Sequence, residues 1–180
     1  MRINSIIKES KVNGPGNRAV IWVQGCKKNC EGCFNQSALA YDAGIEMSPE
    51  QIIDEIEIDK IDGVTISGGE PFDQSMELKK LLSILKAKCI NILIYTGYEY
   101  EYLVSRFLDI LKLCNYIIDG PYRKDRPSLC KWAGSGNQRF LQLESGYILN
   151  DLTESEEYSK NAEIMIDKTG NITITGFIEE

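Results

Sequence analysis

Apolar positions along the chain alternate between runs typical of strands and the three-to-four-residue spacing typical of helices. Strands are predicted at residues 2–8, 18–24, 63–67, 90–95 and 116–119, and residues 139–143 can add another. Ser48-Pro49-Glu50-Gln51 has the form of a helix start with a capping box. Helical stripes are formed by Ile52, Ile53 and Ile56, by Leu78, Leu81, Leu82 and Leu85, and by Leu103, Phe107 and Leu111.

This alternation of strands and helices implies right-handed βαβ crossovers and a mainly parallel sheet. A closed eight-stranded (β/α) barrel needs ~250 residues, whereas the chain has 180. The predicted fold class is therefore α/β, a partial (β/α) barrel of mainly parallel strands. Residues 163–167 and 171–175 alternate around Lys168-Thr169-Gly170, which predicts an antiparallel hairpin. We expect a core of residues 1–145 and a C-terminal extension of residues 146–180 that packs on the same domain.

Composition narrows the possible functions. The formal net charge of −7 argues against nucleic acid as a partner. Histidine is absent, which excludes a Ser-His-Asp triad, a Cys-His pair and a His-ligated zinc. No apolar run has the length of a membrane span, and the first residues are too short an apolar stretch for a signal peptide. The sequence thus predicts a cytoplasmic protein with no membrane partner, in which the six cysteines are metal ligands, redox groups or core residues rather than disulfides.

Three cysteines lie within eight residues, directly after a predicted strand: Cys26, Cys30 and Cys33. Their thiols suit an iron–sulfur cluster or zinc, with a fourth ligand from another Cys, a carboxylate or a non-protein group. A zinc site completed by Cys89, Cys114 or Cys130 is the alternative, although we interpret these three as non-ligands. Ser-Gly-Gly-Glu-Pro at residues 67–71 also follows a strand, and its glycines let the backbone approach a ligand closely.

Several motifs in order resemble one family. They are Asn-Gly-Pro-Gly-Asn-Arg at 13–18, the cysteine motif with Gly25 before it and Phe34-Asn35 after it, the 67–71 turn, Tyr-Thr-Gly-Tyr at 95–98, Asp-Gly-Pro-Tyr at 119–122 and Gly-Ser-Gly-Asn-Gln-Arg at 134–139. Over roughly residues 12–143 the chain resembles the radical S-adenosylmethionine (SAM) superfamily and, within it, the activators of anaerobic ribonucleotide reductase. Gly32 before the last motif cysteine, followed by Phe34, is the variation that those activators show.

The resemblance implies a radical SAM enzyme that generates a glycyl radical on the large reductase subunit. Cys26, Cys30 and Cys33 would ligate a 4Fe-4S cluster, with SAM at its open iron. A one-electron donor such as flavodoxin or ferredoxin would reduce the cluster. Further cofactor-binding candidates are the glycine-turn residues Gly68, Gly69 and Glu70, which would hold the SAM amino group, together with Thr96, Asp119 and Asn137.

For three of these candidates a structural role is the alternative. Thr96 can cap its strand, Asp119 can cap the turn after it, and Asn137 beside Gly136 fits ordinary turn chemistry. The enzyme could also act on another glycyl-radical protein, a peptide or a small molecule. A non-catalytic iron–sulfur or zinc module is a third interpretation, but it leaves residues 67–71 unexplained.

Charge is unevenly distributed along the chain. Residues 122–139 carry Arg123, Lys124, Arg126, Lys131 and Arg139 against Asp125 alone. In the predicted fold this segment and Lys27 and Lys28 lie on the same rim. We hypothesise a basic patch that docks an acidic surface of the electron donor or of the reductase, and scattered solubilising charges are the alternative.

Overall fold

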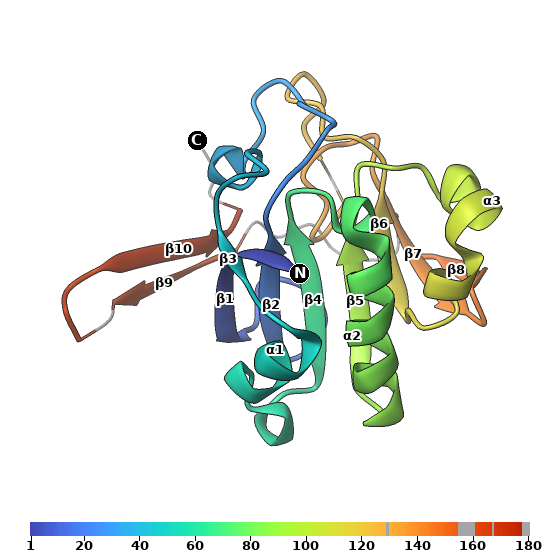
Figure 1. Ribbon diagram of the computed structural model, residues 1–180. Coiled ribbons are helices and arrows are strands. Elements are labelled where there is room, and N and C mark those ends of the chain that lie inside the picture. Colours follow the sequence, from blue (N-terminus) through green and yellow to red (C-terminus); the bar gives the residue numbers. More distant parts are fainter. Residues whose placement is uncertain (129, 155–160, 167, 178–180) are drawn as a thin grey trace.

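The computed structural model describes residues 1–128, 130–154, 161–166 and 168–177. Within them, eight strands form one sheet in the order β3-β1-β2-β4-β5-β6-β7-β8 (Figure 1). These strands are β1 (Arg2–Ser10), β2 (Arg18–Val23), β3 (Ile45–Glu46), β4 (Gly63–Gly68), β5 (Asn91–Tyr95), β6 (Tyr116–Asp119), β7 (Arg139–Glu144) and β8 (Tyr147–Asp151). β8 lies in the predicted extension and adds the last strand of the main sheet, while the division into a core and an extension stays a prediction.

The predicted partial barrel of mainly parallel strands is wrong, because the sheet is open and mixed. In the described residues, three neighbouring pairs are parallel, namely β2 with β4, β4 with β5 and β5 with β6. The β1–β2, β1–β3, β6–β7 and β7–β8 pairs are antiparallel. The helices α1, α2 and α3 each precede one of the parallel strands β4, β5 and β6, whereas the described residues that join β1 to β2 and β6 to β7 form no helix. Without a crossover helix the chain returns to pair antiparallel.

Three α-helices cover one face of the sheet: α1 (Pro49–Glu55), α2 (Ser75–Ala87) and α3 (Tyr100–Leu111) (Figure 1). Ser48 begins α1 with the predicted capping box, closed by Gln51. The predicted stripe of α2 is fully buried, comprising Leu78, Leu81, Leu82 and Leu85. It packs in one apolar core with residues of β2, β4, β5 and β6, including Ile21, Ile66, Ile94 and Ile117. Short 3-10 turns are Gln36–Ala38, Ile58–Lys60 and Pro71–Gln74.

On the opposite face of the sheet lies a buried arginine. The Arg18 guanidinium donates to Thr65 Oγ1 at 2.7 Å, to the Val64 carbonyl at 2.8 Å and to the Pro15 carbonyl at 2.9 Å. It also donates to the side chain and the carbonyl of Asn91. All these acceptors are neutral, and burial lowers the pKa of Arg18 to about 10. Arg18 thus fastens the turn before β2 to β4 and β5.

A separate two-stranded sheet, β9 (Ala162–Ile166) with β10 (Ile172–Gly176), forms the antiparallel hairpin expected from the alternating pattern. Residue 167 of the expected hairpin lies outside the described residues. The hairpin projects from the side of the main sheet (Figure 1). Within the described part of the chain, no helix has the length and apolar character to cross a membrane.

Candidate functional site

The motifs that the sequence analysis singled out meet at one edge of the sheet. The cysteine loop, residues 24–35, follows β2. The glycine turn, residues 67–71, comprises the last two residues of β4 and the three residues after it. Thr96 and Gly97 follow β5, and Asp119 is the last residue of β6. Because β2, β4, β5 and β6 are parallel, their carboxyl ends lie together at the top of the sheet in Figure 1. Open α/β sheets bind ligands at this edge.

Cys26, Cys30 and Cys33 are free thiols of intermediate exposure on this loop. The loop is anchored at its base, where the backbone N–H of Gly25 donates to the Ala38 carbonyl at 2.8 Å. Burial raises the pKa of the Cys26 thiol. Among the described residues, no three Cys, Asp or Glu side chains are grouped to hold a metal ion, so the thiols share a loop without converging. Three accessible soft donors on one short loop nevertheless fit the chemistry of an iron–sulfur cluster.

The glycine turn is hydrogen-bonded to the base of the cysteine loop. The backbone N–H of Gly69 donates to the Val23 carbonyl, and that of Glu70 donates to the Gly25 carbonyl, each at 2.8 Å. A Cβ atom at Gly69 would lie 2.2 Å from the Gly25 carbonyl oxygen. Gly68 has a φ of +102°, which L side chains rarely adopt. The two glycines are therefore needed for this contact between loops, in addition to any role toward a ligand.

Glu70 is 1 % exposed and holds three donors. Its Oε1 accepts from the Thr96 hydroxyl at 2.8 Å and from the Phe72 N–H at 3.1 Å, and its Oε2 accepts from the Gly97 N–H at 2.8 Å. Burial raises the pKa of Glu70 to about 7, although the three donors favour the carboxylate. The structure thus brings Glu70 and Thr96 together, with the Thr96 hydroxyl engaged by the glutamate.

Asp119 is buried in an ion pair with Arg139. The Arg139 Nε donates to Asp119 Oδ1 at 3.0 Å, and the Tyr100 N–H donates to Asp119 Oδ2 at 2.7 Å. Arg139 also contacts both carboxylate oxygens of Glu101, each at 3.0 Å. These bonds connect the end of β6 and the start of β7 to the start of α3. They are not the cap of the following turn that was the alternative for Asp119, and its role toward a cofactor stays a prediction.

A pocket of about 430 Å³ lies over the end of β6, where Asp119, Gly120, Pro121 and Asn137 contribute to its lining. Asn137 Nδ2 donates to the Pro121 carbonyl at 2.8 Å. Its Oδ1 is buried and has no hydrogen-bond partner in the described residues. Buried polar atoms are normally paired. The Asn137 side chain thus lines the pocket with an unpaired acceptor, and its role toward a ligand stays a prediction.

A second pocket, of about 310 Å³, adjoins the first through Glu99 and Pro121 and reaches Lys28 of the cysteine loop. Tyr98 and Tyr102 form its aromatic wall, with ring centroids 4.8 Å apart. Lys28 Nζ lies 3.5 Å from the centroid of the Tyr98 ring. The two pockets together extend from the cysteine loop to Asn137.

Asp73 connects three parts of the site, and the sequence analysis missed it. Its Oδ1 accepts from the Tyr98 hydroxyl at 3.1 Å, and its Oδ2 accepts from the Lys27 N–H at 3.3 Å and from the Tyr41 hydroxyl. The one available signal was its position three residues after Glu70, in the turn that begins at Pro71. Tyr98, the last residue of the Tyr-Thr-Gly-Tyr motif, lines the second pocket.

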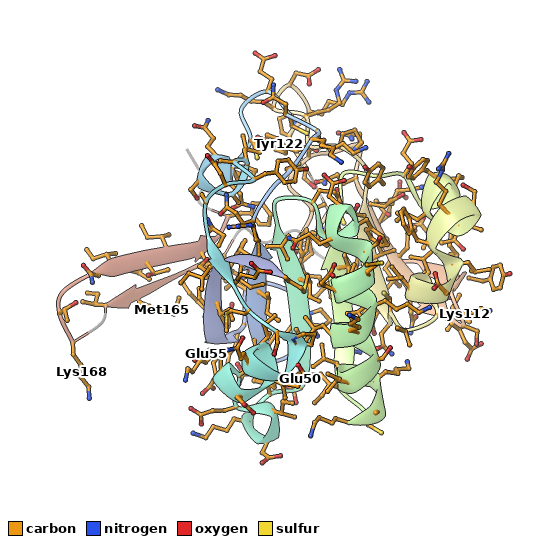
Figure 2. The ribbon with its side chains drawn as sticks, in the orientation of Figure 1. Glu50, Glu55, Lys112, Tyr122, Met165 and Lys168 are labelled. Carbon is orange, nitrogen blue, oxygen red and sulfur yellow. The ribbon has the colours of Figure 1, made fainter. Side chains whose placement is uncertain are left out.

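Aromatic rings from distant segments meet beside the last motif cysteine. The ring centroid of Phe34 lies 4.6 Å from that of Tyr122 and 5.8 Å from that of Phe177. Figure 2 shows Tyr122 at the top of the molecule, above the carboxyl ends of the strands. A Cβ at Gly32 would lie 2.7 Å from Lys124 Cδ. The segment after β6 and the residue after β10 thus both contact the cysteine loop.

Comparison with known proteins identifies the family. The family model described as "4Fe-4S single cluster domain" matches residues 12–141. The anaerobic ribonucleoside-triphosphate reductase-activating protein of Enterobacteria phage T4 is 35% identical over 147 residues, which cover 78% of this chain and 93% of the phage protein. The protein of that name from Escherichia coli K12 is 33% identical over 138 residues, covering 71% of this chain and 89% of its own. The protein of that name from Haemophilus influenzae is 32% identical over 139 residues, which cover 71% of this chain and 88% of the Haemophilus protein.

Proposed function

Because the chain belongs to the family of anaerobic ribonucleoside-triphosphate reductase-activating proteins, we propose that it is the radical SAM activase of such a reductase. When bound and reduced by a one-electron donor, a 4Fe-4S cluster would supply the electron that cleaves SAM to methionine and a 5′-deoxyadenosyl radical, which would take a hydrogen atom from a glycine of the large reductase subunit. The observation that carries this proposal is the glycine turn bonded to the cysteine loop, beside pockets at the carboxyl edge of the sheet.

Cys26, Cys30 and Cys33 are the proposed cluster ligands. Three thiolates leave one iron of a four-iron cluster open, which is where SAM would bind. The thiols are free and partly exposed, so they are accessible to a cluster. No described Asp or Glu is grouped with the thiols as a fourth ligand.

The remaining site residues would bind and orient SAM. Gly68 and Gly69 bring backbone close to the cysteine loop, and Glu70 provides a carboxylate buried between β4 and β5 for the SAM amino group. Thr96 fixes that carboxylate through its hydroxyl. Asn137 Oδ1, which is buried and unpaired, would accept from an adenine or ribose donor, and Asp119 with Arg139 shapes the same pocket.

The test is anaerobic reconstitution with iron and sulfide, followed by reduction and addition of SAM with and without the large reductase. We expect 5′-deoxyadenosine and a glycyl-radical electron paramagnetic resonance signal on the reductase. Formation of 5′-deoxyadenosine without any radical on the reductase would favour another substrate. Stable iron binding with no SAM cleavage would favour a non-catalytic module.

We also propose a cytoplasmic location and an acidic one-electron donor, such as a flavodoxin or ferredoxin. The six cysteines are all free, as a reducing compartment requires. Lys124 contacts the cysteine loop, and Lys27 and Lys28 belong to it, which supports an electron donor docking at this rim.

A further inference from the structure

The C-terminal hairpin carries a row of exposed isoleucines. In the antiparallel register Ile164 pairs with Ile174 and Ile166 pairs with Ile172. Directly opposite residues share a face, so all four lie on one side, which we term the isoleucine face. Their side chains are between 53 % and 68 % exposed. Among the described residues, β9 and β10 pair only with each other.

The opposite face fastens the hairpin to the body of the protein. Glu163 Oε1 accepts from the Lys11 N–H at 2.8 Å, and the Asn13 side-chain amide donates to Thr175 Oγ1 at 2.8 Å. Both contacts are at the base of the hairpin, whereas Met165 and Lys168 lie further out along it (Figure 2). A two-stranded hairpin is marginally stable on its own, and contiguous exposed apolar surface marks an interaction site. In the described part of the chain, the isoleucine face therefore remains exposed.

A second copy of this chain does not provide enough area to cover the face. Strands of five residues form a hairpin face about 17 Å long and about 10 Å wide. Two such faces packed together bury roughly a few hundred Å², well below the about 1,200 Å² of a stable complex. The occupant must therefore make further contacts elsewhere on the protein.

The base of the hairpin is continuous with the cysteine loop. Phe177 follows β10, and its ring packs against Phe34, which directly follows Cys33. A macromolecular substrate whose glycine reaches the cluster has to approach this loop. The same macromolecule can then contact the hairpin, and its contacts at the site supply the area that the isoleucine face lacks.

We propose that the isoleucine face docks into an apolar groove of the large reductase subunit. This inference rests on the proposed function, because it takes the reductase as the substrate. The hairpin lies outside residues 12–141, where the family model matches. The hairpin would therefore add a contact with the reductase to those made by the family core, and the C-terminal extension would help to hold the substrate.

The experiment compares two double variants that remove similar apolar surface. Ile166→Thr/Ile172→Thr alters one cross-strand pair while keeping β-branched residues, so that the hairpin persists. The control, Ile148→Thr/Leu149→Thr, alters exposed residues of β8 at the far edge of the main sheet. Dissociation constants for the large reductase are measured anaerobically by titration calorimetry with the reconstituted proteins. Formation of 5′-deoxyadenosine is measured in parallel with a chemical reductant and no reductase.

For the hairpin variant we expect at least tenfold weaker binding of the reductase, because two buried side chains are lost. SAM cleavage without reductase should equal that of the parent, and the β8 variant should bind normally. Equal reductase affinity in the hairpin variant and the parent overturns the proposal. The proposal is also overturned if the parent forms a dimer, and the hairpin variant loses this dimer but binds the reductase as tightly as the parent. Failure of the parent to cleave SAM would instead contradict the proposed function.

Discussion

Glu70 has two opposing influences on its ionisation. Burial disfavours the carboxylate, while donors from Thr96, Gly97 and Phe72 favour it, and the resulting pKa is about 7. The structure also changes the choice of variant at this position. Glu70→Ala would leave three buried donors without an acceptor, each costing ~1–3 kcal/mol. Glu70→Gln keeps the shape and is the better probe.

The raised pKa of Glu70 predicts a pH-dependent contribution to stability. The protonated form is favoured in the folded state, so this contribution is fully present below the ordinary pKa near 4.5 and is lost as pH rises through about 7. Its size is about 3 kcal/mol, at about 1.4 kcal/mol per pKa unit. Urea unfolding of the apoprotein and of Glu70→Gln between pH 4.5 and 8 measures it. The free energy of unfolding of the parent minus that of Glu70→Gln should fall as pH rises. A difference that is constant or rises with pH would contradict the raised pKa of Glu70.

The cysteines divide into two groups with different expected effects. Replacing Cys26, Cys30 or Cys33 by Ala should abolish the four-iron cluster, because two thiolates cannot hold it. Cys89→Ala, Cys114→Ala and Cys130→Ala should keep iron and sulfide contents near those of the parent. The readouts are iron content and the visible absorbance after anaerobic reconstitution. Loss of the chromophore in one of the second group, with Cys30 dispensable, would refute the ligand assignment.

At the scale of elements, the contact between the glycine turn and the cysteine loop leaves no room for a side chain at Gly69. Gly69→Ala would place a Cβ 2.2 Å from the Gly25 carbonyl oxygen, which is backbone and cannot give way cheaply. We expect a loss of about 1–3 kcal/mol of stability, as for overpacked sites, and lower iron loading. Gly97→Ala is the control, since its Cβ would approach no backbone atom: it would lie 3.2 Å from the flexible Lys28 side chain and, at ordinary contact distance, 3.5 Å from Glu70 Oε2. Thermal unfolding and iron content of both variants measure the effects, and equal behaviour would contradict the tight contact.

The periodic pattern of the sequence predicts elements better than their directions. The stripe of α2 is buried as predicted, and residues 139–143 fall within β7. The direction of β7 was not predictable in the same way, because the long segment from residue 120 to residue 138 gives no periodic signal. Its described residues form no helix, so β7 runs antiparallel to β6. The pairing of Asp119 with Arg139 depends on that register, and a linear pattern does not reveal it.

At the scale of the whole molecule, the basic patch is smaller than the sequence suggested. Arg139 is committed to Asp119 and Glu101, and Arg123 contacts Asp125. Lys131 Nζ lies 4.8 Å from the centroid of the Trp132 ring. Lys124 and Arg126 remain at the rim, where the stem of Lys124 lies against Gly32 of the cysteine loop. The patch is thus an accessible pair of cations beside Lys27 and Lys28, on a protein of net charge −7.

Lys124→Glu/Arg126→Glu should slow reduction of the cluster by an acidic electron donor severalfold at low salt, and the effect should shrink as salt is raised. The control, Lys86→Glu/Lys88→Glu, makes the same charge change at the end of α2, away from the carboxyl edge of the sheet. Stopped-flow bleaching of the cluster over a salt series measures both. Equal rates for both variants and the parent at all salt concentrations would eliminate the patch.

The contacts of the cysteine loop have a consequence for the order of events during synthesis. The thiols lie at residues 26–33, but the loop is hydrogen-bonded to residues 69 and 70, and its Phe34 ring packs against the rings of Tyr122 and Phe177. A ribosome exposes the cysteines long before it makes these partners. We therefore expect the loop to be held in this conformation, and to bind a cluster stably, only after residues 122 and 177 have been made.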